Sequence, residues 1–180
     1  MKWWDDLRRY FYLRNINAKL DGQSPERTIT NLHDANTIGI LYDSTSAEND
    51  TVIAEFAEKL RDVYKKVEVL GFVNAKEVIP QADVTLFCKK DLRWHLAPND
   101  TRVDEFAEKD FDLLLAAFTT ENLPLEYVAR TSQAKWRVGV FDTRKTDYYE
   151  MMIKTGENKD LQYFLDQSTH FLNKIQYDPK

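Results

Sequence analysis

The chain has 180 residues, a formal net charge of −5 and 31% charged residues, which is typical of one soluble globular domain with a sizeable core. This mildly acidic balance provides no electrostatic attraction for nucleic acid or for an anionic membrane. The single cysteine, Cys88, excludes an intrachain disulfide and a cysteine-rich zinc site. Three scattered histidines add no metal-ligand pattern, so we expect no metal.

The sequence carries no targeting or membrane signal. No apolar run approaches the ~20 residues that a transmembrane helix requires. The N-terminal segment mixes charged and aromatic residues, so it lacks the continuous apolar core of a signal peptide. We therefore expect a cytoplasmic protein with no transmembrane segment and no nucleic-acid partner.

Residues 2–20 are predicted to form a helix, because five apolar side chains recur at the helical period of about 100° per residue. These side chains are Trp3, Trp4, Leu7, Tyr10 and Phe11. An aromatic stripe is rarely left in water, so we expect it to pack against the rest of the chain, a second subunit or a protein partner. Nearby arginines permit binding to a bilayer surface as an alternative, which Asp5 and Asp6 disfavour.

The following polar segment, residues 21–36, has no apolar period and carries Gly22 and Pro25, which indicates a connector. We therefore predict two parts: residues 1–36 as an N-terminal amphipathic helix with its connector, and residues 37–180 as a single α/β domain.

From Thr37 onward, β-type apolar runs alternate with helix-patterned segments. This alternation predicts a three-layer α/β fold with a mainly parallel sheet of about five strands, flavodoxin-like or Rossmann-like. Strands are expected at residues 37–43, 67–73, 84–88, 111–118 and 136–141, with residues 151–153 as a candidate edge strand. Helices are expected at residues 46–64, 101–109, 122–133 and 159–176.

Three details of this domain depend on local residues. Thr45 and Glu48 fit a capping box at the first helix of the domain. The run 111–118 is the most apolar and is expected at the centre of the sheet. Only residues 74–83 connect the second and third strands, which is barely enough for a parallel crossover.

Ligands of open parallel sheets bind beyond the carboxyl ends of the strands, where the strand order reverses. If the order is 2-1-3-4-5, the loop after the first strand lies beside the loop after the third. The candidate ligand site then combines Ser44, Thr45, Ser46, Lys89, Lys90, Trp94 and His95. Hydroxyls and free N–H groups at a helix start, facing two ammonium groups, suit a phosphate or carboxylate. The alternative is structural, since serine and threonine before helices mostly act as caps.

No motif indicates catalysis: the chain has no G-x-S-x-G, no G-x-G-x-x-G and no P-loop sequence. His95 is the only histidine expected near the ligand edge, whereas His33 lies in the connector and His170 on the solvent side of the last helix. A catalytic His95 would need an activated nucleophile, and none is evident. Our first hypothesis is therefore a protein that acts through binding or assembly, without catalysis or cofactor. A hydrolase or transferase that uses His95 is the third hypothesis.

Four segments together resemble a family of small bacterial α/β proteins, a domain of unknown function. They are the aromatic and basic opening helix, residues 89–94 (KKDLRW), residues 111–114 (FDLL) and residues 134–139 (AKWRVG). The resemblance covers most of the chain. It implies no established activity, cofactor or catalytic residue.

Two local segments resemble better-understood families. Residues 40–45 (ILYDST), followed by an acidic helix, are similar to the phosphate loop of flavodoxins. This resemblance implies our second hypothesis, a binder of FMN or another phosphorylated ligand, with Trp94 as the stacking aromatic. The unit from residues 111–113 (FDL) to residues 137–139 (RVG) resembles one strand–helix–strand unit of heptosyltransferase-type glycosyltransferases. Those enzymes need two such domains with the donor sugar between them.

Overall fold

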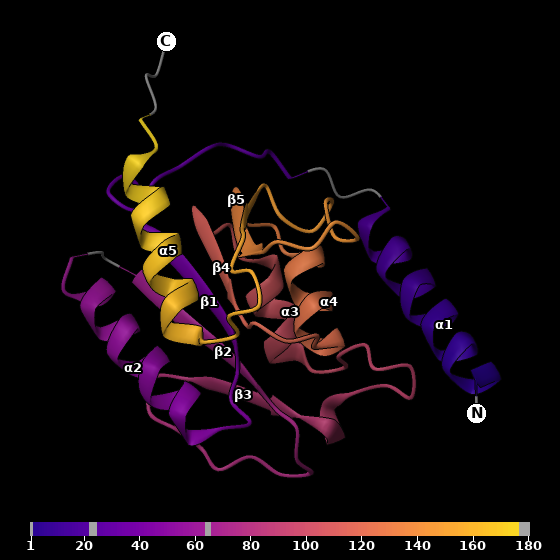
Figure 1. Ribbon diagram of the computed structural model, residues 1–180. Helices are drawn as coiled ribbons and strands as arrows, with labels where there is room; N and C mark the ends of the chain where they lie inside the picture. Colours follow the sequence, from indigo (N-terminus) through magenta and orange to yellow (C-terminus); the bar gives the residue numbers. More distant parts are fainter. Residues whose placement is uncertain (1, 22–24, 64–65, 177–180) are drawn as a thin grey trace.

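The computed structural model describes residues 2–21, 25–63 and 66–176. Six parallel strands form one sheet in the order β3-β2-β1-β4-β5-β6 (Figure 1). They are β1 (Thr37–Asp43), β2 (Lys66–Val73), β3 (Thr85–Cys88), β4 (Leu113–Ala117), β5 (Trp136–Val140) and β6 (Met151–Ile153). The predicted parallel α/β fold is confirmed, and the candidate edge strand at residues 151–153 is the sixth strand.

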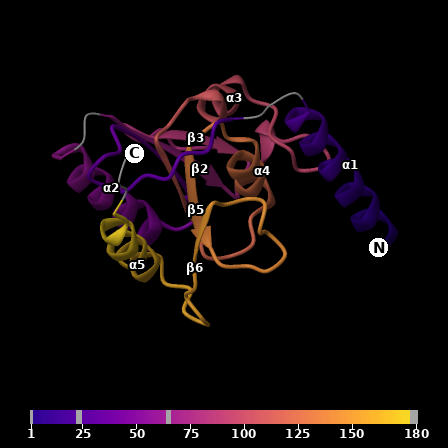
Figure 2. The same cartoon turned by 90° about the horizontal axis from the view of Figure 1, so that it is seen from above.

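Helices cover both faces of the sheet (Figure 2). One face carries α2 (Ala47–Arg61) and α5 (Leu161–Lys174), and the other carries α3 (Thr101–Glu108) and α4 (Leu123–Thr131). Successive side chains of β4 alternate between the two cores, because neighbouring residues of a strand point to opposite faces. β4 is buried along its whole length, which confirms its predicted place at the centre.

The assumed strand order 2-1-3-4-5 is wrong, because β2 lies between β1 and β3. The physical reason is the connection after β2: residues 74–84 contain no helix, so the chain adds β3 directly beside β2 instead of crossing β1. The longer segment after β3 contains α3 and returns the chain to β4, which pairs with the free edge of β1. The order therefore reverses between β1 and β4, as in Rossmann-like folds.

The predicted cap of α2 is displaced by one residue. Ser46, not Thr45, is the N-cap, and its hydroxyl accepts a hydrogen bond from the Asn49 N–H at 3.2 Å. The Thr45 hydroxyl instead accepts from the N–H of Asn74 at 3.1 Å, where the chain leaves β2. Thr45 therefore joins two neighbouring strand ends.

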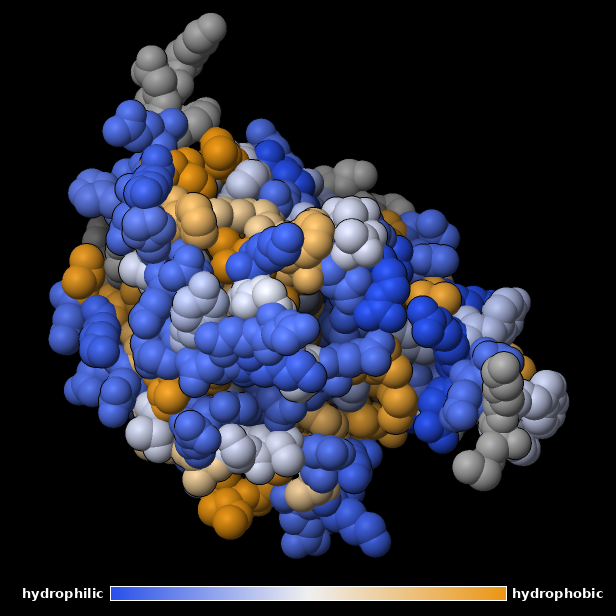
Figure 3. All heavy atoms as spheres, viewed as in Figure 1, coloured by the Kyte–Doolittle hydropathy of each residue, from blue (hydrophilic) through white to orange (hydrophobic). Residues whose placement is uncertain are grey.

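The first helix, α1 (Lys2–Leu20), lies outside the three layers and packs on α4 (Figures 1 and 2). Tyr12 and Ile16 of α1 are buried against Tyr127 of α4. In Figure 3, α1 projects from the right side of a mostly hydrophilic surface on which apolar side chains form small separate groups. Among the described helices, none is long and apolar enough to cross a membrane.

Candidate functional site

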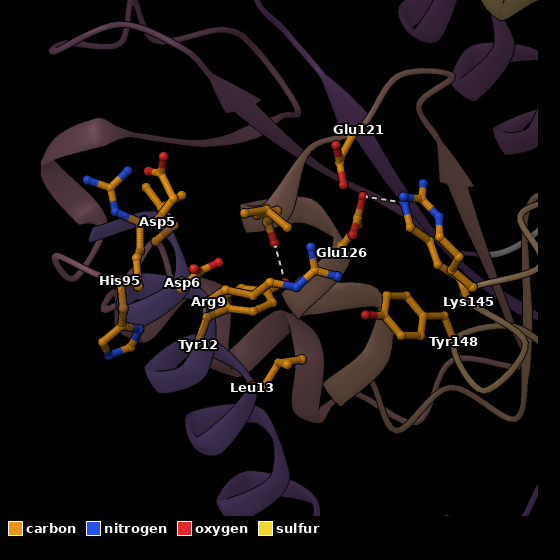
Figure 4. Close-up of a pocket in the computed structure, with 14 residues that line it drawn as sticks. Asp5, Asp6, Arg9, Tyr12, Leu13, His95, Glu121, Glu126, Lys145 and Tyr148 are labelled. Atoms are coloured by element: carbon orange, nitrogen blue, oxygen red, sulfur yellow. Dashed lines mark hydrogen bonds and ion pairs between the residues drawn. The ribbon is translucent and has the colours of Figure 1, made fainter. Parts of the chain in front are cut away.

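A pocket of about 480 Å³ lies between the inner face of α1 and the connections that leave the carboxyl ends of β3, β4 and β5 (Figure 4). Its walls come from residues 5–13 of α1, residues 95–96, residues 121–126 and residues 144–148. We call this cavity the α1 pocket. It joins four segments that are far apart in the sequence, at the edge where parallel sheets bind ligands.

The α1 pocket contains a buried carboxylate, Glu126, which is only 1% exposed. Its Oε1 accepts a hydrogen bond from the N–H of Asn122 at 3.3 Å. The same oxygen accepts one from Nζ of Lys145 at 2.6 Å (Figure 4). Glu126 lies in the first turn of α4, where the helix dipole favours a negative charge. No described residue donates a hydrogen bond to Oε2 of Glu126, so this oxygen is available to a ligand.

Two buried tyrosines also line the α1 pocket. Tyr12 donates a hydrogen bond to the carbonyl oxygen of Leu123 at 2.7 Å. Tyr148 has no hydrogen-bond partner for its hydroxyl among the described side chains and backbone. Burial raises the pKa of both tyrosines, and the nearby Glu126 charge adds to the effect. Both hydroxyls therefore stay protonated at neutral pH and can act as donors.

The rim of the α1 pocket carries charges of both signs. Arg8 and Arg9 come from α1, together with Asp5 and Asp6, and Glu121 comes from the connection after β4. All five side chains are exposed, and none of them forms an ion pair with another described residue. They are therefore free to pair with a charged ligand.

His95 lies in the wall of the α1 pocket and is 7% exposed. Burial lowers the pKa of its imidazole, so the ring is neutral at pH 7. Its Nδ1 is buried and has no hydrogen-bond partner among the described residues, an arrangement that costs about 1–3 kcal/mol. A polar ligand group that reached this nitrogen would remove the cost.

The structure does not bring the predicted phosphate-type site together, because β2 separates the two loops. Each predicted hydroxyl has a structural partner: the Ser44 hydroxyl donates to Oδ1 of Asp50 at 2.5 Å, and Thr45 and Ser46 make the bonds described above. Lys90 pairs with Glu77 at 2.8 Å, and Lys89 is exposed. These contacts agree with the structural alternative for the hydroxyl residues.

The remaining two residues of the predicted site lie beside α1. The Trp94 ring packs on Phe11, with ring centroids 5.2 Å apart, and on His95 at 5.5 Å. Of the seven predicted ligand residues, His95 alone is in the wall of the α1 pocket. Four residues of the pocket were not predicted, because each resembles an ordinary surface or core residue until the strand order is known: Arg9, Glu126, Lys145 and Tyr148.

A second hollow of about 370 Å³ lies at the reversal of strand order, between the ends of β1 and β4. Asp43 and Asn122 line it, and Nδ2 of Asn122 donates to Oδ2 of Asp43 at 3.1 Å. Residues 43–46 contain no glycine, so the usual close approach of backbone N–H groups to a phosphate is missing. A carboxylate at this place disfavours a phosphorylated ligand.

Residues 8–175 match a family described as "Family of unknown function (DUF6913)". The chain belongs to this family. This match confirms the resemblance to a domain of unknown function over most of the length. No curated protein matches the chain.

One similar solved structure is the glycosyl transferase family 9 protein from Veillonella parvula DSM 2008. The TM-score is 0.45 and the sequence identity is 14%, over 72% of this chain and 40% of that chain. The chain thus spans less than half the length of that protein.

Proposed function

We propose that this protein is a cytoplasmic, non-catalytic protein that acts by self-assembly through the outer face of α1. We define this face by Trp3, Trp4, Leu7 and Tyr10. The exposed fractions of Trp3, Trp4 and Tyr10 are 65%, 61% and 59%. This exposure is the observation that carries the proposal, because large aromatic side chains grouped on one helix face indicate an interaction surface.

In the first turns of α1, the apolar and charged side chains are distributed in the reverse of the usual way for a surface helix. Asp5 and Arg9 point to the side of the α1 pocket, whereas the tryptophans lie on the opposite side in solvent. A surface helix normally turns its apolar stripe to the core and its charges to water. Phe11 is the member of the predicted stripe that packs on the domain, against Trp94. The other four side chains of the stripe would be removed from water only by a binding partner.

A second copy of the chain fits this face when the two helices pair in antiparallel fashion about Tyr10. Asp6 and Arg14 lie one turn before and one turn after Tyr10. Each Asp6 would therefore meet the Arg14 of the other copy. Both side chains are exposed, and neither forms an ion pair within the described part of the chain.

The shape of α1 agrees with the same pairing. A shallow hollow on its outer side is lined by Tyr10, Leu13, Arg14, Asn17, Ala18 and Asp21. Trp3 lies two turns before Tyr10 and Asn17 lies two turns after it. In the antiparallel pair, Trp3 of one copy would therefore fill the hollow of the other. Asp6, at the border between this side and the α1 pocket, disfavours an anionic bilayer as the occupant.

Light scattering coupled to size-exclusion chromatography tests this proposal. We expect the full chain to elute with twice its mass of 21.2 kDa. The variant Trp3→Ser/Trp4→Ser/Tyr10→Ser should elute at the mass of one chain. The control Val63→Ser/Ile79→Ser removes two apolar side chains that are even more exposed but lie elsewhere, and it should keep the dimer. A full chain that stays monomeric at all concentrations would contradict the proposal.

The other two hypotheses have no comparable support. No described hydroxyl or thiol hydrogen-bonds to His95, so no observation favours a hydrolase or transferase that uses it. Binding of FMN stays a prediction without an assembled site, and a thermal-shift measurement with FMN tests it.

A further inference from the structure

Several charged or hydrogen-bonding groups that line the α1 pocket have no partner in the described part of the chain. They include both positive and negative side chains. We propose that it binds a small zwitterion with a primary ammonium group and a carboxylate, the chemical class of amino acids and short peptides. This site lies on the inner side of α1, so we expect it to bind its ligand without the self-assembly through the outer face, although Asp6 borders both.

The ammonium end of the ligand is placed by Glu126. One oxygen of this buried carboxylate already caps α4 and pairs with Lys145. The other oxygen lacks a donor among the described residues, although the side chain lines the pocket. A buried carboxylate forms strong charge-assisted hydrogen bonds with ammonium groups. Glu121, an exposed carboxylate of the same wall, adds attraction for the same group.

The carboxylate end of the ligand is placed by Arg9 and Tyr148. Figure 4 shows these two side chains reaching into the pocket from opposite walls, Arg9 from α1 and Tyr148 from the connection after β5. Arg9 has no ion-pair partner among the described residues, and a guanidinium group binds a carboxylate through two parallel hydrogen bonds. The protonated Tyr148 hydroxyl can donate a third.

The charge balance of the walls selects a ligand with both charges. The lining contains four carboxylates, Asp5, Asp6, Glu121 and Glu126, and four cations, Arg8, Arg9, Arg144 and Lys145. A simple anion or a simple cation would meet like charges on half of these groups, whereas a zwitterion can match both sets. The volume of about 480 Å³ is within the range of small-molecule sites.

Isothermal titration of the full chain at pH 7 with the common L-amino acids and simple dipeptides tests the proposal. We expect at least one compound to bind at millimolar concentration or below. The N-acetyl derivative and the methyl ester of that compound should each bind at least tenfold more weakly, because each removes one of the two charges. If no compound binds, or if either derivative binds as tightly as its parent, the proposal is wrong.

Single substitutions test the assigned residues. Arg9→Gln and Tyr148→Phe should each weaken binding about tenfold, and Glu121→Gln should weaken it less. The control Lys59→Gln removes one positive charge from an exposed position on α2, and it should leave the affinity unchanged. Thermal unfolding of each variant checks that it is folded. Equal affinity of folded Arg9→Gln and the unmodified chain would overturn the assignment.

The same titration with the variant Trp3→Ser/Trp4→Ser/Tyr10→Ser separates the two proposals. We expect this monomeric variant to bind the compound with unchanged affinity. Loss of binding in the folded variant would contradict the independence of the pocket from the outer face.

Discussion

Glu126 and Lys145 form an ion pair of 2.6 Å in which the two side chains are only 2% and 14% exposed. Glu126 belongs to the first turn of α4, and Lys145 belongs to the connection that follows β5. The pair therefore holds this connection against α4, where both line the α1 pocket. Because a buried carboxylate is poorly hydrated, the Glu126 charge depends on Lys145 for its compensation.

We expect Lys145→Met to lower the free energy of unfolding by about 3 kcal/mol, because it leaves the Glu126 charge buried without its partner. Urea denaturation followed by circular dichroism measures the change. The double variant Lys145→Met/Glu126→Gln should recover part of the loss. Arg144→Met is the control, since Arg144 is exposed and pairs with Asp142 outside the core. An unchanged midpoint for Lys145→Met would refute the role of this pair.

The buried imidazole of His95 predicts a loss of stability in mild acid. Burial holds the pKa of His95 below its usual value of about 6.5. As the pH falls through about 6.5, the unfolded chain takes up a proton at this position and the folded chain does not. The free energy of unfolding should therefore decrease from pH 7.5 towards pH 5, and less so in His95→Gln.

Thermal unfolding of both proteins across this pH range gives the comparison. His170→Gln removes an exposed imidazole and should keep the pH dependence of the unmodified chain. If the free energy of unfolding falls by the same amount in His95→Gln and in the unmodified chain, His95 does not stay neutral in the folded state.

Gly139 of β5 supports the ring of Tyr149, and a methyl group at this position would clash with it. A Cβ atom on Gly139 would overlap Cζ of Tyr149, and Tyr149 is buried. We expect Gly139→Ala to destabilise the fold by about 1–3 kcal/mol, the usual cost of overpacking a core. Replacement of the ring in Gly139→Ala/Tyr149→Leu should reduce the cost of the alanine, which a double-mutant cycle of denaturant unfolding measures. Additive effects of the two substitutions would contradict this contact.

Local patterns predicted the individual elements well, because burial imposes a clear period on each. β1 has its predicted bounds at Thr37–Asp43, since an uninterrupted apolar run that is buried on both faces has sharp polar limits. The strand order could not be predicted in the same way. The order depends on the position that β3 takes in the sheet after the helix-free connection of residues 74–84. No local period in the sequence encodes that position.

The site was predicted less well for the same reason. The α1 pocket combines Arg9, Glu126, Lys145 and Tyr148, which meet only after the strand order and the docking of α1 are fixed. In the sequence, Glu126 and Lys145 resemble solvated surface charges. The hydroxyl residues after β1 were noticed because they form a local cluster, and the structure uses them in local bonds. His95 lies at the carboxyl edge of the sheet, as expected, but it lines the α1 pocket and not the predicted site.

Thiol cross-linking tests the antiparallel pairing of α1 most directly. The experiment uses a Cys88→Ser background, which removes the single native thiol, and a short bifunctional thiol reagent. We expect Tyr10→Cys to cross-link to itself, because Tyr10 lies at the two-fold axis of the pair. Trp3→Cys should not cross-link alone, but it should cross-link to Asn17→Cys when the two proteins are mixed. Absence of the Tyr10→Cys cross-link, or self-linking of Trp3→Cys in its place, would contradict assembly through the outer face in this register.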